Sequence, residues 1–149
     1  MKVVLDTNIL FSGIARPGGT PGKIVSAWLE GQFDLVLSDA LIEEFSRVLN
    51  YPKIRKLLAG SGVTDDDLRD YVDIFRMKAI VVKTDEVLLA VKPADAKDIP
   101  VVAALVASGA EFLVTGDKKH LLTLGMPQIV TAADFLSRLR AFDQRVSRG

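Results

Sequence analysis

Short apolar runs alternate along the chain with longer segments in which apolar residues recur roughly every three or four positions. The short runs have the length of buried strands, and the longer segments have the period of helices that pack on one side. The pattern predicts strands over residues 3–5, 33–37, 79–82, 112–115 and 128–130. It predicts helices over residues 8–15, 21–30, 39–49, 52–58, 65–77, 98–108 and 132–142.

This alternation of strands and helices is typical of an α/β domain with a mostly parallel sheet covered on both faces. A chain of 149 residues has the length of one domain. We expect that domain over residues 1–142 and a frayed tail over residues 143–149. In such sheets ligands bind beyond the carboxyl ends of the strands, so residues that directly follow a strand are candidates for chemistry.

Composition narrows the classes of function. The chain has 19 basic and 19 acidic residues, and this balance argues against holding nucleic acid by bulk positive charge alone. Because it has no cysteine, disulfides, zinc–thiolate sites and thiol nucleophiles are excluded. The apolar run before Asp6 is too short for a signal peptide, and no segment reaches the ~18–20 apolar residues of a membrane span. We expect a soluble, cytoplasmic protein with no membrane association.

Two aspartates stand at matching positions in the predicted sheet. Asp6 directly follows the first strand, and Asp117 lies just past the fourth, within Thr115-Gly116-Asp117. The carboxyl ends of parallel strands meet at one edge, so both side chains are expected to face the same crevice. An acid after a strand is often only a cap or turn residue, but two at matching strand ends are less ordinary.

Helical geometry separates Glu44 from its neighbour Glu43. At about 100° per residue, the apolar residues of this helix fall within one arc. Glu44 lies on the border of that arc and Glu43 points nearly opposite to it. A carboxylate at the edge of a buried face is costly unless something pairs with it. Glu44 is therefore a candidate for the same crevice, and a local pair with Arg47 or Arg55 is the alternative.

Asp98 begins a predicted helix whose inward face carries Val102 and Leu105. Aspartate is a good N-cap, and a capping aspartate can also be a metal ligand, so both roles stay open. Asp95 precedes it in Asp95-Ala96-Lys97-Asp98 and could serve as an outer partner.

Four carboxylates converging on one crevice would repel one another strongly without cations. Hard divalent ions with oxygen ligands, Mg²⁺ or Mn²⁺, resolve that conflict. Two such ions ~3.5–4 Å apart can activate a water and stabilise the leaving oxygen of a phosphodiester. Hydrolysis of nucleic acid suits this chemistry, and it needs no cysteine, serine or histidine nucleophile.

Four sequence blocks resemble the PIN-domain family in order, spacing and strand context. They read Val3-Val4-Leu5-Asp6-Thr7-Asn8, then Ser38-Asp39-Ala40-Leu41-Ile42-Glu43-Glu44-Phe45 with Val48-Leu49, then Asp95-Ala96-Lys97-Asp98, then Phe112-Leu113-Val114-Thr115-Gly116-Asp117. The resemblance extends to about Leu136. One mild departure is Ile99, where relatives are expected to carry a polar residue; every acid is kept.

The resemblance implies a fold, a site and partners. The fold is a three-layer α/β/α domain with sheet order 3-2-1-4-5. The activity is cleavage of RNA with one or two Mg²⁺ or Mn²⁺ ions, and relatives of this size are often toxins of type II toxin–antitoxin pairs, inhibited by a small antitoxin protein and commonly homodimeric. Carried over by motif, the metal-binding and catalytic set is Asp6, Glu44, Asp98 and Asp117, with Asn8, Thr115 and Asp95 as auxiliary polar residues.

Several basic residues are candidate phosphate contacts, with a solvated surface position as the alternative for each. They are Arg16, Lys53, Arg55, Lys56, Lys118, Lys119 and His120. The segment Gly19-Thr20-Pro21-Gly22-Lys23 faintly resembles a phosphate-binding loop. It lacks the first glycine at the required spacing and the Ser/Thr after the lysine, so it is rejected as one.

Two other functions compete with the nuclease. The first is a catalytically silent domain of this fold that binds RNA or a protein, which the loss of an acid would favour; none is lost here. The second is a receiver-type phosphotransfer domain, in which a lysine follows a later strand. Lys118 and Lys119 keep that reading open, but it assigns no role to Glu44.

Overall fold

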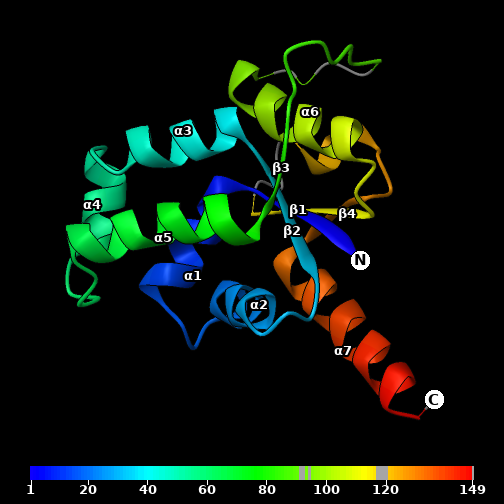
Figure 1. Cartoon of the computed structure of the whole chain (residues 1–149), viewed down its shortest axis with the longest axis horizontal. Helices are drawn as coiled ribbons and strands as arrows, with labels where there is room; N and C mark the ends of the chain where they lie inside the picture. The colour runs from blue at the N-terminus through cyan, green and yellow to red at the C-terminus, as the bar shows by residue number, and fades with distance from the viewer. Residues whose placement is uncertain (91–92, 94, 117–120, 149) are drawn as a thin grey trace.

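The computed structural model of the chain describes residues 1–90, 93, 95–116 and 121–148 (Figure 1). Within them the sheet has five strands, all paired in parallel, in the order β3-β2-β1-β4-β5. The strands are β1 (Lys2–Leu5), β2 (Asp34–Ser38), β3 (Ile80–Val82), β4 (Phe112–Thr115) and β5 (Ile129–Thr131). The predicted α/β class and strand order are both confirmed.

The helices begin and end close to the predicted positions. They are α1 (Thr7–Ala15), α2 (Thr20–Leu29), α3 (Asp39–Val48), α4 (Pro52–Leu58), α5 (Asp65–Lys78), α6 (Ile99–Ser108) and α7 (Ala132–Arg148), with 3-10 turns η1 (Ala96–Asp98) and η2 (Leu122–Leu124). Ser38 caps α3 by accepting a hydrogen bond from the Leu41 N–H, at 3.1 Å. Thr64 and Asp67 form a reciprocal capping box at the start of α5.

Two boundaries differ from the prediction, each for a local reason. The helix expected from Asp98 starts one residue later, at Ile99, because Asp98 belongs to the 3-10 turn η1 that precedes it; Pro100 stands in the first turn of α6, where no N–H has to be donated. Helix α7 continues beyond Phe142 through residues 143–148, where we expected a frayed tail. No helix-breaking residue occurs in that stretch before Gly149.

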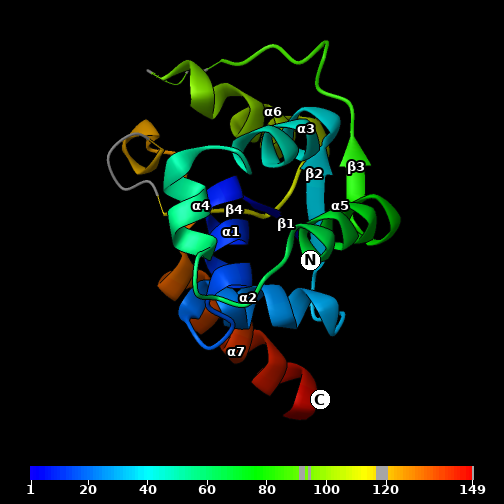
Figure 2. The same ribbon diagram turned by 90° about the vertical axis from the view of Figure 1, so that its left-hand side faces the viewer.

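The helices form a layer on each face of the sheet. Helix α6 contacts β1, β2, β3 and β4, whereas α7 contacts β4 and β5 and packs against α2. Figures 1 and 2 show α6 and α7 on opposite sides of the sheet, in two views at right angles. Helices α3, α4 and α5 follow one another beside α1, and α1 contacts both α3 and α4.

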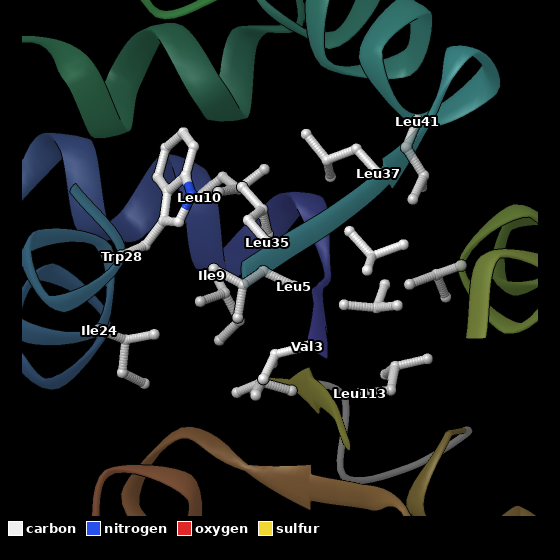
Figure 3. Packing of buried hydrophobic residues seen from close by; sticks show 14 of the residues in the cluster. Val3, Leu5, Ile9, Leu10, Ile24, Trp28, Leu35, Leu37, Leu41 and Leu113 are labelled. Carbon is white, nitrogen blue, oxygen red and sulfur yellow. The ribbon is translucent and has the colours of Figure 1, made fainter. Parts of the chain in front are cut away.

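The core is a continuous apolar cluster between these layers. Val3, Leu5, Leu35 and Leu113 are fully buried strand residues. Figure 3 shows Val3, Leu5 and Leu35 on the side of the sheet where Ile24 and Trp28 of α2 lie. The Phe11 ring of α1 stacks on the Phe45 ring of α3, with centroids 4.3 Å apart and planes 2° apart. This stack sets how α3 approaches α1, and Glu44 precedes Phe45 directly.

Two glycines let α1 and α2 lie against each other closely. A Cβ on Gly13 would come within 2.7 Å of the Val25 side chain and 2.9 Å of the Pro21 carbonyl oxygen. A Cβ on Gly22 would lie 2.3 Å from the Pro17 carbonyl oxygen. Both positions therefore require glycine for space. This is the structural reason for Gly22 in the segment that faintly resembles a phosphate-binding loop.

Candidate functional site

Asp6 stands at the carboxyl end of β1, where the strand passes into α1. Its N–H continues the sheet by donating to the Val114 carbonyl of β4, at 3.0 Å. Its carboxylate accepts a hydrogen bond from the hydroxyl of Thr115, the last residue of β4, with Oγ1 and Oδ2 2.9 Å apart. Thr115 is fully buried, so this contact holds the Asp6 side chain at the edge of the sheet.

Thr7 is a site residue that the sequence reasoning missed. It is buried, and its hydroxyl lies 3.4 Å from Asp6 Oδ1 as a donor. The same hydroxyl also lowers the pKa of Glu44, and its single proton serves one of the two carboxylates at a time. Thr7 thus reaches both carboxylates. The available signal was its place directly after Asp6 at the start of a helix, where a hydroxyl stays close to the strand ends.

Glu44 reaches the site from α3. It is half-buried while Glu43 is exposed, as the helical arc predicts. Burial is the main cause that raises the pKa of Glu44 above its ordinary value, and the negative charge of Asp6 is the second. Arg47 and the Thr7 hydroxyl lower that pKa, and the charge of Asp98 raises it further. Glu44 therefore shares an electrostatic environment with both aspartates.

Asp98 lies at the junction of η1 and α6 and is 8% exposed. It occupies the N-cap position of α6, but its side chain makes no capping hydrogen bond. Asp95 does make one: its carboxylate accepts from the Lys97 N–H, at 3.0 Å, and caps η1. Asp95 acts here on the turn that carries Asp98, and it is not among the side chains that line the cleft described next.

Asp6, Glu44 and Asp98 line one cleft of about 290 Å³, which we call the acidic cleft. They come from the end of β1, from α3 and from the turn before α6. Asn8 also lines the acidic cleft, and it borders a second cavity of about 500 Å³ that Thr115 and Gly116 line as well. Three chain segments far apart in sequence thus bring their carboxylates to one place.

The remaining sequence candidates separate into distinct groups. Asp117, Lys118, Lys119 and His120 lie outside the described residues. Of the other basic candidates, Lys53 lines the acidic cleft and Arg55 instead pairs with Asp65 on α5, with Nη1 and Oδ1 2.6 Å apart. Arg16 and Lys56 are exposed and line neither cavity. Tyr51 and Lys97 line the acidic cleft and were not expected there.

The donor set of the acidic cleft suits a hard divalent cation. All three described acids offer carboxylate oxygens. The pKa of Glu44 is raised chiefly by burial and, after that, by the negative charge of Asp6. Within the described part of the chain, which leaves out Asp117, no group of three or more acidic or histidine side chains is arranged to hold one ion. Mg²⁺ is commonly bound through one or two carboxylates and several waters, so this spacing is compatible with it.

The family model of the PIN domain matches residues 2–119. The chain belongs to the PIN-domain family. PIN domains are generally nucleases, and the match spans Asp6, Glu44, Asp98 and Asp117 together with all strands except β5.

One relative of this PIN domain has no described function. An uncharacterized protein of Methanocaldococcus jannaschii is 34% identical over 62 residues, which make up 42% of this chain and 40% of that protein. The chain therefore matches less than half of that relative's length. No solved structure matches the chain. Among the described helices, none is long and apolar enough to cross a membrane.

Proposed function

We propose that this PIN domain is a metal-dependent endoribonuclease that hydrolyses phosphodiester bonds of RNA. Asp6, Glu44, Asp98 and Asp117 would hold one or two Mg²⁺ or Mn²⁺ ions. The observation that carries the proposal is the meeting of Asp6, Glu44 and Asp98 in one cleft, in a chain whose family consists generally of nucleases.

The chain's own residues would prepare the site for an anionic substrate. When bound, the metal supplies charge stabilisation and a water of lowered pKa. Thr115 and Thr7 hold the Asp6 carboxylate through their hydroxyls, which fixes its orientation before substrate arrives. Asn8, exposed at the mouth of the cleft, is placed to contact a substrate oxygen or a water.

We propose further that the protein acts in the cytoplasm as the toxin of a type II toxin–antitoxin pair, as a homodimer with a small antitoxin protein as inhibitor. The four sequence blocks resemble the PIN-domain family, and members of this size are often such toxins, which supports this role. Arrest of bacterial growth on expression, absent in an Asp6→Asn variant, tests it.

The nuclease activity is tested with single-stranded RNA in Mg²⁺ or Mn²⁺ and in EDTA. We expect cleavage with metal and none with chelator. Asp6→Asn should lower kcat/KM by about a hundredfold or more, because a bound ion contributes several kcal/mol of charge stabilisation. Glu43→Gln is the matched control, since Glu43 is exposed beside Glu44, and it should cleave like the parent.

Full cleavage in EDTA, or by Asp6→Asn, would refute the metal mechanism. RNA that is bound but never cleaved, with either ion, would instead support a catalytically silent RNA-binding module.

A further inference from the structure

An aromatic side chain stands at the rim of the acidic cleft. Tyr51 joins α3 to α4, is 50% exposed, and lines the same cavity as Glu44 and Asp98. A half-exposed tyrosine is ordinary on a protein surface by itself. Tyr51 is a candidate substrate contact because it lines the cleft of the proposed RNA-cleaving site, and aromatic faces bind unpaired nucleobases.

Two lysines from different parts of the chain line the same cleft. Lys53 belongs to α4 and Lys97 to η1, and both are exposed. In the part of the chain that the structure describes, neither ammonium makes an ion pair, although four arginines do. Neither lysine is among the charges that shift the pKa of Glu44, so they do not neutralise that carboxylate. Their charge is available to an anion entering the cleft.

The acidic cleft thus combines three kinds of group that a nucleotide needs. Carboxylates suit metal ions at the scissile phosphate, cations suit the neighbouring phosphates, and an aromatic ring suits a base. The volume of about 290 Å³ lies near the lower end of the range of about 300–1,000 Å³ for small-ligand pockets.

We propose that Tyr51 stacks on one unpaired nucleobase next to the scissile phosphate while Lys53 and Lys97 contact backbone phosphates, so that these three side chains position the RNA over the carboxylates of the acidic cleft. The inference rests on the proposed function and adds the residues that position the substrate. In a duplex the bases are stacked on one another and none is available to the Tyr51 ring.

Tyr51 can be replaced without disturbing the fold. Its side chain makes no capping hydrogen bond to α4. The bonds that anchor it are backbone ones: its N–H donates to the Val48 carbonyl at 3.0 Å, and its carbonyl accepts from the Ile54 and Arg55 N–H groups, both at 3.0 Å. Any residue other than proline preserves them, so thermal melts of the variants should match the parent.

The first experiment measures binding without cleavage. A fluorescently labelled single-stranded RNA without self-complementarity is titrated in EDTA with the parent, Tyr51→Phe, Tyr51→Leu and Phe142→Leu. Phe142 is a matched control because it is 45% exposed on α7 and lines none of the cleft. We expect Tyr51→Leu to raise Kd about tenfold, in line with the loss of one base–aromatic stack, and Tyr51→Phe and Phe142→Leu to bind like the parent.

The second experiment locates the stacked base. One abasic nucleotide is moved stepwise along the RNA. In the parent, an abasic nucleotide at one position of the RNA should weaken binding, because it removes the stacked base. In Tyr51→Leu an abasic nucleotide at that position should have no effect, because the stack is already lost. Tyr51→Trp adds a direct signal: Trp28 is only 3% exposed, so quenching by RNA would come from the new indole.

The third experiment tests the lysines through salt dependence. Lys53→Gln should lower the slope of log K against log salt by about 0.7, the value for one phosphate contact of a single strand. Lys56→Gln on the same helix is the control, since Lys56 is exposed outside the cleft, and it should leave the slope unchanged.

The outcomes separate this inference from the proposed function. Equal RNA binding and equal kcat/KM for Tyr51→Leu and the parent, with cleavage intact, would overturn the stacking role alone. A parent that neither binds nor cleaves RNA would overturn both. Binding of a matched duplex as tight as that of the single strand, and equally unaffected by Tyr51→Leu, would overturn stacking of Tyr51 on an unpaired base.

Discussion

At the scale of single residues, one step along α3 decides between a site residue and a surface residue. Glu43 and Glu44 have the same chemistry, but the helix turns Glu44 toward α1 and the end of β1 and Glu43 into solvent. The Phe11–Phe45 stack holds α3 in that orientation. Glu44 consequently carries a raised pKa, caused chiefly by burial and by the Asp6 charge.

This raised pKa predicts a pH-dependent effect of Glu44→Gln in EDTA. Below the ordinary value of 4.5 the carboxyl is protonated in both folded and unfolded chains and costs no stability. As pH rises through the folded-state pKa, the unfolded chain ionises more easily, so the parent loses stability. Glu44→Gln removes that loss. In urea unfolding, the free energy of unfolding of the variant minus that of the parent should therefore increase from acidic to neutral pH. A difference in free energy of unfolding that stays constant across this pH range would contradict the raised pKa of Glu44.

At the scale of elements, close packing of α1 and α2 explains why the segment that faintly resembles a phosphate-binding loop contains Gly22. Gly22 lies in the first turn of α2, and a Cβ there would meet the backbone oxygens of Pro17 and Arg16 at 2.3 and 2.5 Å. These atoms belong to the turn that joins the two helices and have little freedom to move. The glycine is therefore needed for packing, and no phosphate-binding role has to be assigned to it.

Gly22→Ala should lower the free energy of unfolding by about 2 kcal/mol, because the contacts with rigid backbone atoms lie at the upper end of the overpacking cost. Forced contacts of this kind cost about 1–3 kcal/mol, against a helix-propensity gain of up to about 1 kcal/mol. Gly18→Ala is the matched control in the same connection, because a Cβ there meets nothing within 4 Å and its φ is not positive. Urea melts measure both variants, and a Gly22→Ala protein as stable as the parent would show that the turn can relax.

At the scale of the whole molecule, the acidic cleft links metal binding to stability. The carboxylates of Asp6, Glu44 and Asp98 come from elements that meet only in the folded chain. Without a cation their mutual repulsion opposes that meeting, and an ion that binds the folded state alone favours it. The closeness of these three carboxylates therefore makes the free energy of unfolding depend on the metal ion.

Thermal melts of the parent and Asp98→Asn, in EDTA and in Mn²⁺, test this link. Mn²⁺ at about a hundredfold excess over its Kd should stabilise the parent by ~2.7 kcal/mol. Asp98→Asn removes one charge, so in EDTA it should be at least as stable as the parent, and it should lose most of the gain with Mn²⁺. If Asp98→Asn instead melts well below the parent in EDTA, Asp98 is chiefly structural, although its side chain makes no capping bond.

The order and type of the elements could be predicted from the sequence because their signals are local. Apolar runs mark the strands, and Ser38 and Thr64 mark helix starts through contacts that span only three residues. The arc of α3 likewise separates Glu44 from Glu43 without knowledge of the fold. The pairing order of the strands came from the family resemblance, since no local pattern encodes which strands are neighbours.

Only the tertiary structure decided which basic, hydroxyl and aromatic side chains join the acids in the acidic cleft. Arg55 and Lys53 look equivalent in sequence, but α5 places Asp65 beside Arg55 and leaves Lys53 at the cleft. Thr7, Tyr51 and Lys97 join the site because α1, α4 and η1 converge there. Such proximity depends on packing between residues distant in the chain, and the periodicity of a single element carries no information about it.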